Sequence, residues 1–111
     1  MKLPRDTVMA REKPTKYLLV PQPRGDKSRF LRRGGYILEN VETLERDLYA
    51  LASMAEAIAG EIIEHGQYYI AFGEFAGPSG VSLKVKTIWM TEHLSDVTKF
   101  ITLIPQKKRS G

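Results

Sequence analysis

The sequence predicts an α+β domain, in which N-terminal helices are followed by a four-stranded antiparallel β-sheet. Three observations predict this class. Apolar residues recur at helical spacing between Val41 and Ala55, and beyond Ile58 the apolar period changes from about 3.6 residues to about 2. The later segments are rich in tyrosine, phenylalanine and isoleucine, which suit a pleated surface. Helices first and strands afterwards, in a chain of 111 residues, are typical of one α+β domain.

Two or three helices are expected ahead of the sheet, from three candidate segments. They are 14–20, Lys27–Arg33, and a main helix that begins at the N-cap Asn40 and ends between Ser53 and Ala59. Pro14 stands in the first turn of the first segment, where its missing N–H costs little, and Asp26 is an N-cap for the second. The main helix has one apolar stripe that should face the sheet: Val41, Leu44, Leu48, Leu51, Ala52 and Ala55.

Four strands are expected, over Ile58–Glu64, Gln67–Phe75, Val81–Thr91 and Val97–Ile104. A four-residue turn at 77–80 would pair Phe72 with Val85 and Gly73 with Lys84. On that register Tyr68, Ile70 and Phe72 pack on the main helix, and the open face carries Tyr69, Lys84, Lys86, Phe100 and Thr102. One bulge would reverse such assignments, because successive side chains of a strand point to opposite faces.

The whole chain, 1–111, is expected to be a single domain. It divides into an irregular arm over 1–13, a folded core over 14–105 and a basic, mobile tail over 106–111.

The charge is divided along the chain. Residues 1–33 carry ten basic and three acidic side chains, residues 34–80 carry one basic and eight acidic, and residues 81–111 carry six basic and two acidic. A basic surface built from both ends of the chain would attract a polyanion such as RNA. The same charge also serves solubility alone.

The composition excludes several classes of site. The absence of cysteine rules out disulfides, thiolate zinc sites and thiol catalysis, and two histidines, His65 and His93, are too few for a metal cluster. We therefore expect neither a metal nor another cofactor. No apolar run approaches the ~20 residues of a membrane span and no signal peptide opens the chain, so the sequence indicates a cytoplasmic protein without membrane contact.

Several short strings resemble an uncharacterised family of small bacterial domains. The strings are Lys16-Tyr17-Leu18-Leu19, Gly25-Asp26-Lys27 with Phe30-Leu31, Gly73-Glu74-Phe75 with Gly77-Pro78-Ser79-Gly80, Val85-Lys86-Thr87-Ile88-Trp89, and Ile101-Thr102 closing with Pro105. Together they cover most of the chain from Lys16 to Pro105. The family has no established activity, so this resemblance implies no reaction.

The layout is also similar to that of the barnase, EndoU, colicin and RelE class of toxin ribonucleases. This architectural likeness implies a small metal-independent ribonuclease, with an immunity or antitoxin protein as partner. The chain has Asp26 before Lys27, where many such toxins have histidine. It has Ile104 before Pro105, where the family's closing strand more often ends with tyrosine.

The candidate site residues follow from this class and from the predicted open face. We assign catalytic roles to Lys27, Lys86 and Thr102, and RNA-binding roles to Arg29, Arg33, Tyr69 and Lys84. Cleavage by 2′-OH attack needs a base, a proton donor and cations that hold the charged phosphorane. The lysines would stabilise that charge, and threonine or tyrosine would orient the hydroxyl or the phosphate.

A non-catalytic interaction module is the alternative, with its sheet face or N-terminal arm as the binding surface. No conventional base accompanies the lysines on the predicted open face, and Ile88, Met90 and Phe100 would add apolar area there. A protein partner or a second copy of the chain would cover that area. The sequence thus favours an RNA-directed, toxin-type ribonuclease, with the interaction module or homodimer as its alternative.

Overall fold

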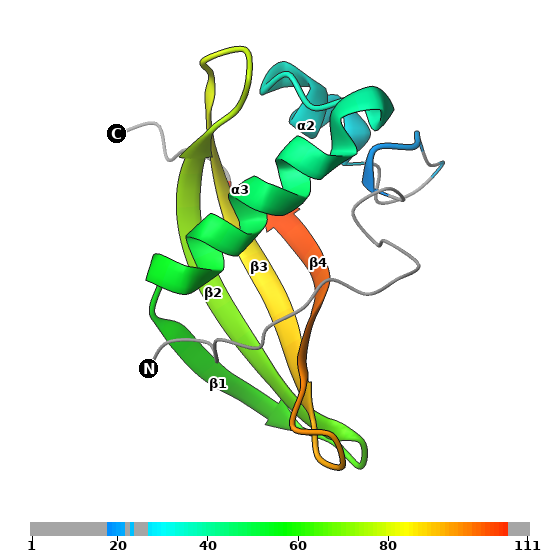
Figure 1. Cartoon of the computed structure of the whole chain (residues 1–111), viewed down its shortest axis with the longest axis vertical. Coiled ribbons are helices and arrows are strands. Elements are labelled where there is room, and N and C mark those ends of the chain that lie inside the picture. The colour runs from blue at the N-terminus through cyan, green and yellow to red at the C-terminus, as the bar shows by residue number, and fades with distance from the viewer. Residues whose placement is uncertain (1–17, 22, 24–26, 107–111) are drawn as a thin grey trace.

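The computed structural model describes residues 18–21, 23 and 27–106. Its elements in chain order are α2 (Ser28–Arg33), a short 3₁₀ turn η1 (Leu38–Asn40), α3 (Val41–Met54), β1 (Ala57–Ile62), β2 (Gly66–Ala76), β3 (Ser82–Glu92) and β4 (Thr98–Pro105). The strands form one antiparallel sheet in the order β1-β2-β3-β4, and α3 lies across one face of it (Figure 1). A helix packed on a four-stranded antiparallel sheet confirms the α+β class.

α3 is the amphipathic helix that the sequence predicts. Its buried residues are Leu44, Leu48, Leu51 and Ala52, which recur at the spacing of one helix face. Asn40 stands before the helix, but its side chain bonds backward along the chain. Its Oδ1 accepts from the N–H of Ile37 at 2.8 Å, and its Nδ2 donates to the carbonyl oxygen of Gly35 at 2.9 Å. The expected N-cap residue therefore stabilises the turn before α3.

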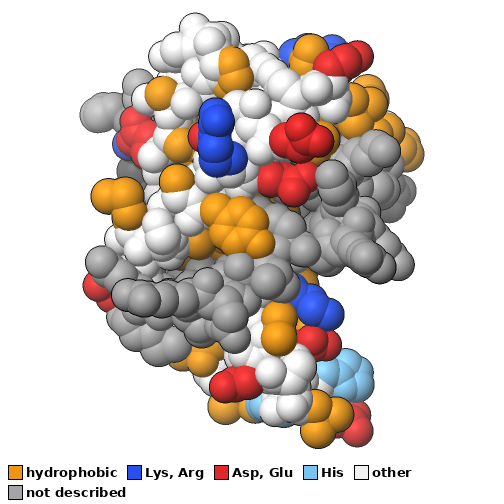
Figure 2. All heavy atoms as spheres, in the orientation of Figure 1, with side chains coloured by type: hydrophobic (Ala, Val, Ile, Leu, Met, Phe, Trp, Pro, Cys, Tyr) orange, Lys and Arg blue, Asp and Glu red, His pale blue; other side chains and the backbone are white. Residues whose placement is uncertain are grey.

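The core fills the space between α3 and the inner face of the sheet. Its largest fully buried side chains include Trp89 and Phe100, whose rings meet edge-on with centroids 5.2 Å apart. Tyr36, which precedes α3, is also fully buried and meets Phe75 edge-on at 5.7 Å. On the molecular surface that Figure 2 shows, the side on which α3 covers the sheet, acidic side chains lie next to apolar ones.

The loop between β2 and β3 spans 77–81, because Ala76 pairs with Ser82. This loop docks on the end of α2, where the N–H of Ser79 donates to the carbonyl oxygen of Gly34 at 3.0 Å. Both elements lie at the same end of the sheet, at the top of Figure 1. The predicted four-residue turn is therefore wrong by one residue.

The longer loop reverses the faces of β2. Gly73 lies opposite Val85, and Tyr69 lies opposite Trp89, so both are on the side of α3. The predicted packing of Phe72 on the main helix is wrong, since its side chain is 48% exposed. The β2 side chains on the open face are Tyr68, Ile70, Phe72 and Glu74, opposite Met90, Ile88, Lys86 and Lys84 of β3.

The register of β4 corrects a second expectation, because Thr91 pairs with Thr98 and Trp89 therefore pairs with Phe100, before a bulge at Ile101. Thr102 pairs with Ile88, and the next residue of β4 to pair is Phe100, so Ile101 has no partner on β3. Phe100 is only 1% exposed and belongs to the core, so its predicted place on the open face is wrong. Thr102 lies on the open face, opposite Ile88 and not opposite Lys86 as predicted.

Part of the predicted N-terminal organisation lies outside the described residues. The helix expected over 14–20 falls largely there, so the plan of two or three N-terminal helices is not established as a whole. The expected arm over 1–13 and residues 107–111 of the expected tail lie outside as well. Within the described ranges, none of the helices has the length and apolar character needed to cross a membrane.

Candidate nucleic-acid interface

Lys27 stands directly before α2 and reaches the edge strand β4. Its carbonyl oxygen accepts from the N–H of Leu31 at 3.0 Å, so the start of α2 holds its backbone. Its Nζ donates to Oγ1 of Thr102 at 3.1 Å, across 75 positions of sequence. Both residues are half-buried. Two of the three residues with predicted catalytic roles are therefore in direct contact.

Lys86 lies on β3, next to the strand that carries Thr102. The pairs Lys86–Ile104 and Ile88–Thr102 place Lys86 and Thr102 diagonally across the two strands, where Cα atoms are about 7–8 Å apart. A lysine side chain spans such a distance. The Thr102 hydroxyl thus lies beside Lys27 and within reach of Lys86.

A groove of about 580 Å³ lies between α2 and the ends of β3 and β4, and its lining does not include Lys27, Lys86 or Thr102. Its lining includes Phe30, Arg33, Glu74, Leu83, Lys84 and Gln106. Arg33 and Lys84, both predicted to bind RNA, therefore share one groove with an aromatic ring. Cations that follow a phosphate backbone and aromatic rings that stack on bases are the usual components of a site for single-stranded nucleic acid.

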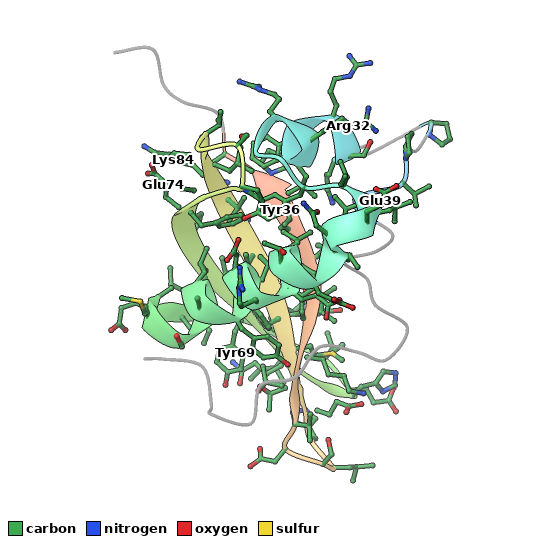
Figure 3. The ribbon with its side chains drawn as sticks, turned by 45° about the horizontal axis from the view of Figure 1, so that its top comes forward. Arg32, Tyr36, Glu39, Tyr69, Glu74 and Lys84 are labelled. Carbon is green, nitrogen blue, oxygen red and sulfur yellow. The ribbon has the colours of Figure 1, made fainter. Side chains whose placement is uncertain are left out.

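Arg29 and Glu74 flank the cations of this groove. Arg29 is exposed on α2, four positions before Arg33 and hence on the same helix face. Glu74 lies opposite Lys84 on the neighbouring strand, and the two side chains lie side by side in Figure 3. A carboxylate beside Lys84 partly offsets the positive charge of the groove.

Tyr69 is not part of this surface. It lies opposite Trp89 on the face that packs on α3, is half-buried there, and donates from its hydroxyl to Oε1 of Gln67 at 3.4 Å. Figure 3 shows it well away from Lys84. Its predicted place beside Lys84 and Lys86 is wrong, because the loop has five residues instead of four. The extra residue shifts the register by one position and moves the side chain of Tyr69 to the opposite face of the sheet.

Both histidines lie at the opposite end of the sheet from α2 (Figure 2). The N–H of His93 donates to the carbonyl oxygen of His65 at 2.9 Å, and its Nε2 lies 3.1 Å from the carbonyl oxygen of Ile63. These contacts join two loops. Among residues 18–21, 23 and 27–106, no three His, Asp or Glu side chains are grouped in a way that could hold a metal ion.

Phe30 and Glu74 are groove residues to which the sequence alone assigned no role. Phe30 is partly buried against the core. Glu74 occurs in one of the strings that resemble the small bacterial family. Only the register of β2 on β3 shows that it stands opposite Lys84.

Comparisons with known proteins identify a family and a fold. A family model described as "Domain of unknown function (DUF6883)" matches residues 3–107. A chain in the solved structure of a contact-dependent growth inhibition toxin–immunity protein complex from Klebsiella pneumoniae 342 is similar in fold, with a TM-score of 0.68 and 18% sequence identity. The similarity covers 92% of this chain and 95% of that chain. No curated protein matches in sequence. At this identity the likeness shows the fold alone.

Proposed function

Since the chain belongs to the DUF6883 family of domains of unknown function and resembles in fold a chain of a toxin–immunity protein complex, we propose that it is a toxin domain. We propose further that its target is RNA and that it cleaves RNA without a metal. The observation that carries the proposal is the contact between Nζ of Lys27 and Oγ1 of Thr102 at 3.1 Å.

A half-buried lysine bonded to a threonine hydroxyl is suited to a phosphate. Threonine can donate to one phosphate oxygen, and the ammonium of Lys27 keeps two further protons for others. Lys86, on the adjacent strand, would add a second cation. When the 2′-oxygen attacks phosphorus, its proton would pass to solvent water, and the departing 5′-oxygen would take a proton from the ammonium of Lys86. The products would be a 2′,3′-cyclic phosphate and a free 5′-hydroxyl, and the phosphorane between them would carry additional negative charge. Two fixed ammonium groups would stabilise that charge.

The neighbouring groove would hold the nucleotides beside the cleaved bond. Arg33 and Lys84 line it and would contact phosphates, and Phe30 would stack on a base. Arg29 would extend the cationic surface along α2. The groove is open at the protein surface, which suits a single strand or an unpaired loop of RNA.

Incubation of the purified chain with total RNA in excess EDTA tests this function. We expect discrete cleavage by the parent chain and its loss in the Lys27→Ala, Lys86→Ala variant and in Thr102→Val. Thr102→Ser, which keeps the hydroxyl, should retain activity. Lys99→Ala is the matched control, because Lys99 is also on β4 but pairs with Glu92 at 3.1 Å. Intact RNA in the parent lane would refute the ribonuclease proposal.

A non-catalytic interaction module is the second candidate, and the open face of the sheet favours it. Phe72 and Ile104 lie there beside Lys86 and are 48% and 37% exposed. An immunity or antitoxin protein, or a second copy of the chain, would cover such side chains. An apolar interface holds its affinity as salt rises, whereas an interface with RNA loses it steeply.

A further inference from the structure

β2 extends beyond the strand beside it. Ala57, the first residue of β1, pairs with Ala71, and β2 continues to Ala76. The stretch 72–76 pairs with β3 on one side, and no strand within residues 27–106 pairs with it on the other. Within the part of the chain that the structure describes, this stretch of β2 is therefore a free edge, in addition to the outer edges of β1 and β4.

The free edge presents backbone groups for pairing. In antiparallel strands, successive residues direct their N–H and C=O groups to alternate sides. The N–H of Gly77 donates to the carbonyl oxygen of Val81 at 3.1 Å, toward β3. By alternation, Glu74 and Ala76 direct their N–H and C=O groups to the free edge. Groups arranged in this way are a template for one further strand.

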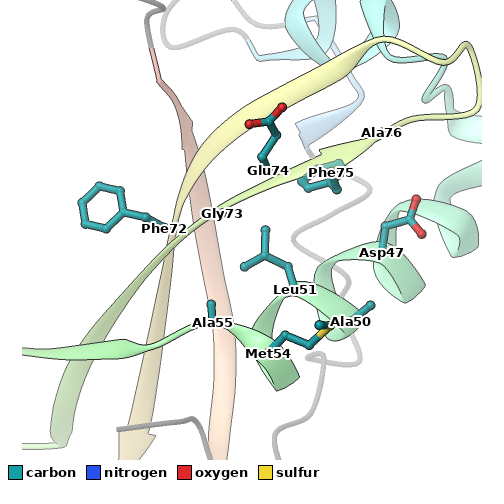
Figure 4. Close-up of a pocket in the computed structure, with 10 residues that line it drawn as sticks. All are labelled: Asp47, Ala50, Leu51, Met54, Ala55, Phe72, Gly73, Glu74, Phe75 and Ala76. Atoms are coloured by element: carbon teal, nitrogen blue, oxygen red, sulfur yellow. The ribbon is translucent and has the colours of Figure 1, made fainter.

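An apolar groove of about 370 Å³ runs beside this edge (Figure 4). α3 contributes Leu51, Met54 and Ala55 to its lining, and β2 contributes Phe72, Gly73 and Phe75. The Met54 side chain is 78% exposed and that of Phe72 is 48% exposed. A strand added to β2 would place alternate side chains in this groove, which gives the backbone pairing an apolar anchor.

The surroundings of the groove are acidic. Asp47 and Glu74 both line it, and residues 34–80, which form α3, β1 and β2, carry eight acidic side chains and one basic side chain. We propose that the free edge of β2 binds an extended segment of a second protein, in which apolar residues alternate with lysine or arginine. The proposal concerns this edge alone and does not depend on activity toward RNA.

A second copy of this chain fits the edge less well than such a partner. Antiparallel pairing of two copies over 72–76 is centred on Glu74, which would then stand opposite Glu74 of the other copy. Like charges directly opposite each other destabilise a strand pair. A basic segment brings the opposite charge to the same position.

Amide hydrogen exchange on the ¹⁵N-labelled full chain tests the proposal. The probe is a ten-residue peptide that alternates valine and lysine, with alternate amides N-methylated so that one edge alone can pair. We expect the peptide to slow exchange at the amides of Glu74 and Ala76 at least tenfold. A matched peptide with glutamate in place of lysine should bind at least tenfold more weakly. Unchanged exchange at both amides in millimolar valine–lysine peptide would overturn the proposal.

Two variants connect binding to the edge and to the groove. Glu74→Pro removes the N–H that faces the free edge, a position at which proline is tolerated in sheets, and it should abolish binding, whereas Glu74→Ala should still bind. Met54→Lys changes an exposed residue that pairs with no strand, so folding is retained, and its charge and lost apolar contact should weaken binding about tenfold. Equal affinity of Met54→Lys and the parent would contradict the proposed groove.

Related measurements distinguish two other possible occupants of the free edge of β2. A dimer of the free chain that Glu74→Pro converts to monomer would assign the edge to a second copy. Protection of Glu74 and Ala76 in the free chain that is lost when residues 1–17 are removed would assign it to the chain's own N-terminal segment. Either result would overturn the proposal of a separate partner.

Discussion

The indole N–H of Trp89 donates to Oγ1 of Thr87 at 2.8 Å inside the core. Thr87 in turn donates to the carbonyl oxygen of Ala71 at 2.7 Å, and both Thr87 and Trp89 are fully buried. One hydroxyl therefore satisfies a donor on β3 and an acceptor on β2. The arrangement explains why a threonine stands among the apolar residues of the inner face.

Thr87→Val should lower the free energy of unfolding by about 1–3 kcal/mol, because it leaves the buried N–H of Trp89 without an acceptor. Chemical denaturation of the purified variant measures this change. Thr87→Ser is the control, since it keeps the hydroxyl and loses one methyl group, worth about 0.8 kcal/mol. A valine variant as stable as the parent would show that the hydroxyl contributes nothing.

Tyr36→Phe should destabilise the protein in a pH-dependent way. The buried hydroxyl of Tyr36 donates to Oδ2 of Asp47, and its loss should cost about 1.5–3 kcal/mol at neutral pH. Burial, and then the Asp47 carboxylate, raise the pKa of Tyr36 well above its usual value. The folded state therefore keeps a proton that the unfolded state releases above about pH 10.

The stability conferred by Tyr36 is thus complete below about pH 10 and is lost as the pH rises further. Urea denaturation of the parent and of Tyr36→Phe, at neutral pH and in the alkaline range, isolates this contribution. The difference in free energy of unfolding between the two proteins should shrink as the pH rises. A constant difference would show that the phenol titrates alike in both states.

Gly77→Ala should disturb the contact between the 77–81 loop and α2, whereas Gly80→Ala should strain the backbone of the loop alone. A Cβ at Gly77 would overlap the carbonyl oxygen of Gly34, so Gly77→Ala should displace the end of α2 and cost about 2–3 kcal/mol. Gly80 has φ +86° and open space around it, so Gly80→Ala adds only left-handed strain of about 1–2 kcal/mol. Amide shifts of Leu31 should move in the Gly77 variant and stay in place in the Gly80 variant. Movement in both would contradict the proposed docking.

The sequence predicts the elements of this fold better than their register. The apolar stripe of α3 recurs at helical spacing, and the burial of Leu44, Leu48 and Leu51 follows from it. The length of the 77–81 loop cannot be predicted from the sequence pattern, because it depends on a tertiary contact, the hydrogen bond between Ser79 and Gly34. One extra residue in that loop moved Tyr69 to the other face.

In the candidate site, too, the sequence indicates the residues but not the register that brings them together. Lys27 and Thr102 are identifiable from the strings that contain them, but the bulge at Ile101 decides which residue stands opposite Thr102. A bulge of this kind has no clear signal in an apolar strand. Lys84 and Lys86 lie on the open face as predicted, since β3 kept its expected orientation while β2 and part of β4 did not.

The salt dependence of RNA binding should report the groove cations. Each phosphate contact to a single strand contributes about −0.7 to the slope of log K against log salt. Arg33→Gln with Lys84→Gln, which removes two cations that line the groove, should make the slope less steep by about 1.4. Anisotropy of a labelled 2′-O-methyl RNA, which lacks the attacking hydroxyl, measures binding without cleavage between about 50 and about 200 mM salt.

Lys99→Gln is the charge-matched control for that measurement, because Lys99 pairs with Glu92 on the part of β4 farther from α2. It should leave the slope unchanged. A slope that both variants reduce equally per charge would mean that RNA responds to the overall charge of the protein. A slope that neither variant changes would place RNA, if it binds, away from the groove between α2 and β3. Only a change confined to the Arg33 and Lys84 variant agrees with a phosphate path through that groove.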